Sequence, residues 1–372
     1  MSIRATRPED RDGRVIDLTN PDEIDVVDDV PRRRRAFTRS EAIEGLVALL
    51  ASLAFVEVLR VVFQQRSLVG AVIWTFFGFL AVYALLVRDR ADTETAVDRV
   101  VTVAIWTTGA LVVAALAWML IYLVSKGLPA LRPSFFTQDL SKVGPLNPGG
   151  GAKHAIIGTF EQVAIATVIV VPIAVLTAIY LNEIKGRLAL PVRIIVDAMS
   201  GMPSIVAGLL VFTVWVDGHG FSGIAGSGAL VVLMLPTVTR TSEEILRTIP
   251  DQLREGGLAL GAPQWRLVMR VVVPTALAGL MTAVILGIAR AIGETAPMIL
   301  TAFGADTTNV NPTHGPQGDL PLFVLKLIRV PNATQNQRAW TGALILVMLV
   351  LVLFVAARLV TSRSQRKLGR AR

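Results

Sequence analysis

Two oppositely charged residues stand four apart in an otherwise apolar run in the last third of the chain. Arg290 and Glu294 belong to the string Arg290-Ala-Ile-Gly-Glu294-Thr-Ala-Pro297. Residues four apart share a helix face, and ionisable groups at membrane depth usually face a bundle interior or a water-filled path. A guanidinium group donates two parallel hydrogen bonds, which suits tetrahedral oxyanions. The pair predicts either an ion pair that joins helices, or an anion path in which Glu294 holds Arg290 until an anion arrives.

A second pattern lies in the polar segment 240–274, between two apolar runs. Glu255-Gly256-Gly257 is followed four residues later by Gly261, and Pro274 comes thirteen residues after that glycine. Pro250 suits a first helical turn, and Gly261 has the backbone freedom for a sharp change of direction. The segment predicts a lever: a helix over 250–262, a turn, and a return to the membrane at Pro274. Its predicted coupling residues are Pro250, Leu253, Glu255, Gly256, Gly257, Leu258, Gly261 and Pro274.

The elements that position these residues are membrane helices. Hydrophobic residues make up 53% of the 372, and a helix needs about 20 apolar residues to cross the hydrocarbon core. The fold class is therefore an all-α polytopic membrane protein. Pro203 and Pro236 are expected to interrupt spans, and Gly201 and Gly208 to allow close helix approach. The eight predicted spans are 45–63, 68–87, 100–124, 155–181, 191–216, 223–239, 275–303 and 340–360.

Lysine and arginine indicate the orientation of these spans, because they concentrate in cytoplasmic loops. With the N-terminus inside, 26 of the 36 Lys and Arg residues fall on the inner side and eight on the outer side. Both termini are therefore predicted to be cytoplasmic, and so is the 240–273 loop. The net charge of +8 then indicates contact with anionic lipid, and no nucleic-acid partner is expected.

The chain divides by composition into four parts. Residues 1–44 form a charged tail predicted to be disordered, and 361–372 a second basic tail. Residues 45–98 are predicted to be a transmembrane hairpin and linker, in which Glu57 and Arg60 pair on one helix face. Residues 99–360 carry both patterns described above and are predicted to be the main transmembrane domain.

Covalent chemistry is not expected of this chain. It has no cysteine and only three histidines, whose spacing does not suggest a metal site. No Walker sequence follows the Gly149-Gly150-Gly151 run, which predicts a flexible helix entry instead of a phosphate-binding loop.

The 240–274 pattern resembles the EAA loop of type I ABC importer permeases, E-A-A-x3-G-x9-I-x-L-P, with Val271 and Val273 before Pro274. Gly256 and Gly257 replace the alanines of the pattern, which loosens the helix by up to about 1 kcal/mol each. The string around Arg290 is similar to that of PstA-type permeases of phosphate ABC importers. Further similar stretches are 149–160, 172–183, 202–209 and 235–244, and the resemblance covers about 100–360.

The resemblance implies a bacterial cell-membrane permease that forms half of a phosphate path and takes its driving force from another chain. The implied partners are a sister permease (PstC), two copies of an ATPase (PstB) and an external phosphate-binding protein (PstS). ATP and Mg²⁺ would be bound by the ATPase, and this chain would bind no cofactor and no metal.

Four alternative functions can be compared with this expectation. A permease for another oxyanion, such as molybdate or sulfate, would have the same kind of loop. A secondary anion carrier would need no ATPase, but the inverted repeat typical of many carriers is not evident. A membrane enzyme is disfavoured because no nucleophile, metal cluster or acid–base pair is expected at a plausible cleft. A membrane scaffold would explain the spans but not the loop.

Overall fold

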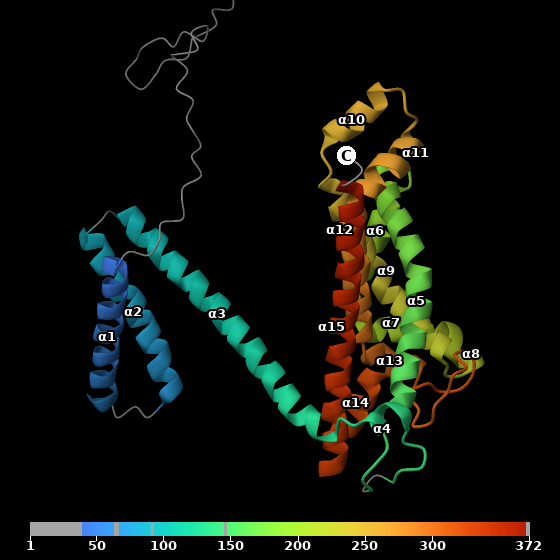
Figure 1. Ribbon diagram of the computed structural model, residues 1–372, viewed down its shortest axis with the longest axis horizontal. Coiled ribbons are helices and arrows are strands. Elements are labelled where there is room, and N and C mark those ends of the chain that lie inside the picture. The colour runs from blue at the N-terminus through green and yellow to red at the C-terminus, as the bar shows by residue number, and fades with distance from the viewer. Residues whose placement is uncertain (1–38, 63–66, 91–92, 145–146, 370–372) are drawn as a thin grey trace, which may run out of the picture. The chain divides into compact units, whose positions relative to one another are not determined.

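The computed structural model describes residues 39–62, 67–90, 93–144 and 147–369, and within these ranges the chain is almost entirely helical. The chain divides into two compact units, Met1–Ala115 and Leu116–Arg372 (Figure 1). Residues 1–38 of the predicted tail 1–44 lie outside the described residues. The predicted domain boundaries stay predictions.

The first unit contains α1 (Arg39–Val62), α2 (Leu68–Arg90) and the first part of α3 (Thr93–Gly127). α1 and α2 pack side by side, and the buried core of the unit includes Ala48, Tyr83, Val87 and Ala96. The predicted pair within α1 is confirmed, because Nη1 of Arg60 lies 3.0 Å from Oε2 of Glu57.

The second unit holds the remaining helices and three π-helical turns, in which backbone bonds skip one residue more than in an α-helix. The π turns are η2 (Tyr180–Ile184), η3 (Phe212–Val216) and η4 (Val268–Val272), and a 3₁₀ turn, η1 (Leu128–Ala130), follows α3. The helices are α4 (Pro133–Thr137), α5 (Lys153–Ile179), α6 (Ala189–Ser200), α7 (Ser204–Val211), α8 (Asp217–His219), α9 (Gly223–Arg247), α10 (Asp251–Ala259), α11 (Gln264–Leu267), α12 (Val273–Ile292), α13 (Ala296–Thr301), α14 (Leu320–Ile328) and α15 (Ala333–Gly369).

α9 is the central helix of this unit. It packs against α5, α6, α7, α12 and α13, and the apolar part of its span is 61% buried, whereas no other candidate span in the described residues exceeds 39%. Small and branched side chains fill the contact with α5, including Ala166, Val170, Leu230 and Met234. The helices around α9 therefore expose much of their apolar surface, as expected of a chain that lies in lipid and has protein partners.

Membrane-length helices confirm the predicted fold class. The described residues contain six helices long and apolar enough to span a membrane, and a bent pair that makes a seventh if it is counted as one span. The remaining predicted span, 45–63, falls on α1, whose side chains are described only in part. α10 and α11 lie at one end of the second unit, and α4 and α14 lie at the other (Figure 1).

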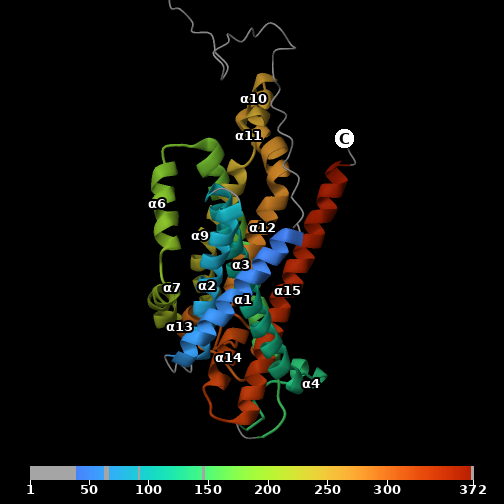
Figure 2. The same ribbon diagram turned by 90° about the vertical axis from the view of Figure 1, so that its left-hand side faces the viewer.

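Proline and glycine break two of the predicted spans. The span 191–216 is two helices, α6 and α7, bent by 107° at Gly201–Pro203, and Figure 2 shows α6 along the side of the bundle with α7 turned away from its axis. Pro203 cannot donate a helical hydrogen bond and disfavours helix in the residue before it. Pro236, in contrast, lies inside the continuous α9.

The predicted span 275–303 is wrong at both ends. The helix begins at Gln264 and ends at Ile292, and α13 follows as a separate short helix. Pro297 is the reason that the helix does not continue to residue 303, because proline cannot donate to the carbonyl of Gly293 and its ring would clash there. Glu294 therefore lies in a break between two helices instead of inside one.

Close helix approach is confirmed at Gly208 and not at Gly201. A Cβ at Gly208 would lie 2.6 Å from Cα of Pro297, whereas a Cβ at Gly201 would be no closer than 3.8 Å to any neighbour.

We expect Gly208→Ala to lower the free energy of unfolding by about 1–3 kcal/mol, because the α13 backbone must move. Thermal unfolding of the purified chain measures this, with Gly201→Ala as control. Equal midpoints for the two variants would contradict the prediction.

Candidate functional site

The segment between α9 and α12 forms a short helix that stands clear of the bundle. Pro250 precedes α10 with an extended backbone (ψ 137°), and Asp251 opens the helix, where a negative charge is favourable. α10 has no buried residue. Leu253 and Leu258 are 40% and 52% exposed, so the predicted apolar coupling side chains are available to a partner.

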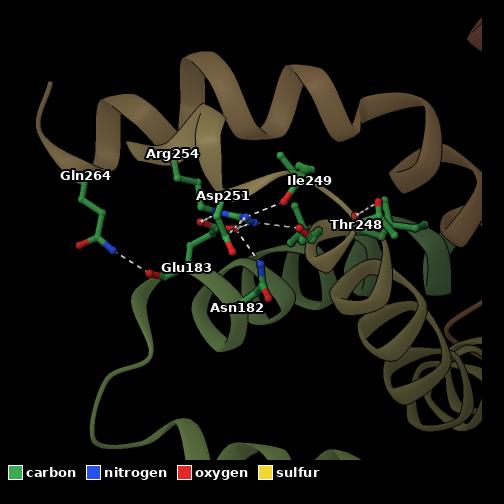
Figure 3. A network of polar contacts seen from close by, with 9 residues as sticks. Asn182, Glu183, Thr248, Ile249, Asp251, Arg254 and Gln264 are labelled. Atoms are coloured by element: carbon green, nitrogen blue, oxygen red, sulfur yellow. Dashed lines mark hydrogen bonds and ion pairs between the residues drawn. The ribbon is translucent and has the colours of Figure 1, made fainter. Parts of the chain in front are cut away.

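Arg254 attaches α10 to the bundle (Figure 3). Its Nε and Nη2 lie 3.1 and 2.8 Å from the two carboxylate oxygens of Glu183, which is in the π turn η2 at the end of α5. The other N–H groups donate to Oδ1 of Asp251 and to the carbonyl oxygens of Ile249 and Leu246, at 2.9, 2.7 and 2.9 Å. A guanidinium has five N–H donors, so this arrangement uses them all. The pair with Glu183 raises the pKa of Arg254.

Glu183 is itself held from several sides. Nδ2 of Asn182 donates to Oε1 of Glu183 at 2.7 Å, and Nε2 of Gln264 in α11 donates to the backbone carbonyl of Glu183 at 2.6 Å. The π turn ends at Lys185, whose backbone is left-handed (φ 52°). The end of α5 therefore contacts both α10 and α11, the outward and returning arms of the segment.

The return of the chain to the bundle is partly as predicted. Gly261 has φ +75°, a left-handed conformation that only glycine adopts freely, so the predicted turn is confirmed. Pro274, however, lies inside a continuous helical stretch, because the π turn η4 comes directly before it and Val273 donates to the carbonyl of Val268, five residues back. A π turn is a common way for a helix to accommodate a disturbed hydrogen-bond ladder.

A second charged cluster, which the sequence patterns did not indicate, lies where α6 meets α9. Glu243 is buried, and its carboxylate lies 2.6 Å from Nη2 of Arg193, 2.6 Å from Nη2 of Arg247 and 3.3 Å from Nη1 of Arg240. Arg240 also pairs with Asp197 of α6. Three arginines around one buried carboxylate hold the first half of the bent pair α6–α7 against the central helix.

Arg290 and Glu294 are brought near each other in a loose pair. Nε of Arg290 lies 3.9 Å from Oε1 of Glu294, and the two side chains are 53% and 17% exposed. Nη1 of Arg290 donates to Oγ1 of Thr237 in α9 at 3.1 Å. About half of the Arg290 side chain is exposed on the described chain, and its separation from Glu294 is longer than a hydrogen bond.

Glu161, another acidic residue of α5, contacts a buried glutamine. Nε2 of Gln317 lies 2.5 Å from Oε2 of Glu161, and Oε1 of Gln317 accepts from Nε2 of Gln162 at 2.9 Å. Gln317 is fully buried and fills the space beside Gly223, where a Cβ would lie 1.9 Å from its oxygen. The loop 304–319 is thereby fixed to α5 and lies against α9.

Residues 170–368, more than half of the chain, match the family described as binding-protein-dependent transport system inner membrane component. The chain belongs to this family. The match includes α10, the turn at Gly261 and Arg290, so the predicted resemblance to importer permeases is confirmed.

Relatives of similar sequence align with about two thirds to three quarters of the chain. The chain is 38% identical over 276 residues to phosphate transport system permease protein PstA 1 of Mycobacterium tuberculosis (strain ATCC 25618 / H37Rv), with 72% of this chain and 90% of the relative covered. It is 38% identical to PstA of Haemophilus influenzae, with 66% and 86% covered. An inward-facing MetNI methionine ABC transporter chain aligns with a TM-score of 0.47 and 23% identity, over 57% of this chain and 94% of that chain.

The attachment of α10 is testable by protease access. We expect Arg254→Lys, which keeps the charge but has three donors where arginine has five, to increase proteinase K cleavage within 248–264 by about tenfold. Glu183→Gln should have a similar effect, and the double variant should add little to either, because the two residues share one interaction. Glu255→Gln, on the exposed side of the same helix, is the control. Additive effects of the two substitutions would contradict a direct pair.

The two glycines of α10 are expected to behave differently. A Cβ at Gly256 meets no atom within 4 Å, whereas one at Gly257 would lie 2.4 Å from Cδ1 of Leu267 in α11. Gly256→Ala should therefore stabilise α10 by up to about 1 kcal/mol, while Gly257→Ala displaces a buried leucine and should cancel that gain. Hydrogen exchange of the α10 amides measures both. Equal protection in the two variants would show that Leu267 moves aside freely.

Proposed function

We propose that this chain is the transmembrane permease subunit of an ATP-driven phosphate importer and forms half of the translocation path. The family assignment supports a permease of a binding-protein-dependent system. Identity of 38% to phosphate transport permeases supports phosphate as the cargo. The observation that carries the proposal is the joint presence of an exposed, anchored α10 and a half-exposed Arg290 in one bundle.

The coupling step follows from the attachment of α10. A partner ATPase that binds ATP and Mg²⁺ would receive Leu253 and Leu258 in an apolar groove and move α10 as it closes. Arg254 would pass this movement to Glu183 at the end of α5, since a guanidinium bound through all its donors is fixed in both direction and position. Gly261 allows α10 to change its angle relative to α11 and α12.

The anion step uses Arg290. With the cytoplasmic end at α10, an anion released at the outer end by a binding protein would reach Arg290 beside the break between α12 and α13. Its uncommitted N–H groups would bind the anion, and the loose contact with Glu294 would hold the side chain when the site is empty. A sister permease of similar fold would supply the other half of the path.

The proposed setting is a bacterial inner membrane with both termini in the cytoplasm. The Lys and Arg bias across the loops supports this orientation. The proposed partners are the sister permease PstC, a PstB ATPase dimer and the phosphate-binding protein PstS. A permease for molybdate or sulfate remains the second candidate, because α10 and Arg290 would serve any tetrahedral oxyanion in the same way.

Uptake by the reconstituted complex tests the cargo and the arginine together. The chain, its sister permease, the ATPase and the binding protein in proteoliposomes should import labelled phosphate only with ATP. Arg290→Gln should reduce the uptake rate by at least about tenfold, because the variant has no positively charged donor for the anion. Arg290→Lys keeps the charge and should retain part of the uptake rate. Import of molybdate or sulfate in place of phosphate would overturn the cargo, and undiminished import by Arg290→Gln would overturn the anion contact.

The turn at Gly261 is expected to be essential for coupling. Proline requires φ near −65°, whereas Gly261 has φ +75°, so Gly261→Pro should misdirect α10 while leaving Arg290 untouched. We expect phosphate uptake to be lost while binding of the external protein persists, measured in the same proteoliposomes. Gly256→Pro cannot serve as the control because proline would break α10. The control is Gly109→Ala in α3, where an added Cβ has no atom within 4 Å. Normal uptake in Gly261→Pro would refute the lever.

A further inference from the structure

Asp319 is a buried carboxyl group with one oxygen in use. It caps α14, where its Oδ1 accepts the backbone N–H of Leu322 at 2.8 Å. The residue is 3% exposed, and its Oδ2 is buried without a hydrogen-bond partner among the described residues. A capping role needs only the first oxygen, so the second is unexplained.

The unpaired oxygen belongs to a small cavity that also reaches the proposed anion path. Asp319, Glu294, Gln162 and Thr159 line a cavity of about 10 Å³. Oε1 of Gln162 is likewise buried without a described partner, while its Nε2 is committed to Gln317. The Thr159 hydroxyl already donates to one backbone group and accepts from another. Two buried acceptor oxygens, Oδ2 of Asp319 and Oε1 of Gln162, thus belong to residues that line the cavity and have no partner among the described residues. A proton on Asp319 would supply a hydrogen-bond donor for this pair.

Charged groups from each neighbouring element surround Asp319 without giving it a cation. α5 contributes His154, the break before α13 contributes Glu294, and the outer loop contributes Asp306. α14 contributes Lys326, whose Nζ lies 2.6 Å from Oδ2 of Asp306; Arg329, just after α14, lines the same outer cavity of about 420 Å³. Since the ammonium group is paired with Asp306, the carboxyl of Asp319 is left to the effect of burial, which raises its pKa to about 7.

We propose that Asp319 carries a proton, with which its carboxyl group donates a hydrogen bond to Oε1 of Gln162, and that loss of this proton weakens anion binding at Arg290. The proposal rests on the proposed function for its second half. Ionised Asp319 would place a second negative charge in the cavity that Glu294 lines, and Glu294 is the acidic partner of Arg290. The electrostatic potential at Arg290 would become more negative, and an incoming anion would bind less tightly. A water molecule could donate to both acceptors, but it would leave an ionised carboxylate fully buried.

Asp319→Asn is the decisive variant. The amide keeps an oxygen for the Leu322 N–H, since asparagine is a good helix cap, and its NH₂ donates permanently to Gln162. Phosphate uptake by the full complex in proteoliposomes is compared at pH 6 and pH 8, as the ratio of variant to wild type, which removes the pH dependence of phosphate itself. We expect equal KM values at pH 6 and a KM about five- to tenfold lower in the variant at pH 8, with Vmax unchanged. Asp217→Asn, on an exposed carboxyl of α8 away from both cavities, is the control and should show a pH-independent ratio. A ratio for Asp319→Asn that is the same at both pH values overturns the effect on anion binding.

A readout without transport separates this proposal from the proposed function. A raised pKa means that the contribution of Asp319 to stability is fully present below about pH 3.8 and is lost as pH rises through about 7. The thermal midpoint of the wild-type complex in nanodiscs should therefore fall more between pH 5 and pH 8 than that of Asp319→Asn. The infrared band of a protonated carboxyl group should be present in the wild type at pH 6 and missing in the variant. Parallel midpoints and an unchanged band would overturn the proton site, whereas a complex that imports no phosphate but shows both signatures would overturn only the cargo.

Discussion

The contact between Arg254 and Glu183 is the interaction on which the α10 end of the bundle depends. α10 buries none of its own residues, so apolar packing cannot hold it, and a helix of this length is not stable alone in water. One guanidinium bound through all five donors replaces the missing packing. Such a contact is directional, whereas an apolar contact allows sliding. A helix fixed this way can be exposed to a partner on nearly all sides and still keep one orientation relative to α5.

The same principle recurs where helices meet away from the apolar core. Glu243 collects three arginines at the junction of α6 and α9, and Gln317 ties the outer loop to α5 through two side chains. Buried polar contacts of this kind add little net stability, but they allow only one arrangement of the elements that they join. The core around α9 supplies cohesion, and the polar contacts set the position of the elements at both ends.

Much of this architecture could be predicted from the sequence, because it depends on local properties. Apolar runs of membrane length indicate spans, and Gly261 indicates a turn because glycine tolerates the required backbone angle. The end of α12 was missed, since apolar residues continue past Pro297 and hide the break. The contacts of Glu183 with Arg254 and of Arg193 with Glu243 join residues 71 and 50 positions apart. Residue spacing within one helix cannot predict such pairs, because they form only when separate helices pack together. Asp319 was missed for the same reason: its burial is a property of the folded loop.

The π turn η4 has a consequence for how this part of the chain can change in length. An α-helix advances about 100° per residue, and a π turn contains one residue more than the α-helical turn that it replaces. Deleting a residue from 268–272 would therefore allow a regular helix, but it would rotate everything before it, including Gly261 and α10, by roughly 100° about the axis of α12. The number of residues between Gly261 and Pro274 thus determines the direction of α10 around the α12 axis as well as its distance. Insertions or deletions in this interval would change that direction even if every residue of α10 were kept.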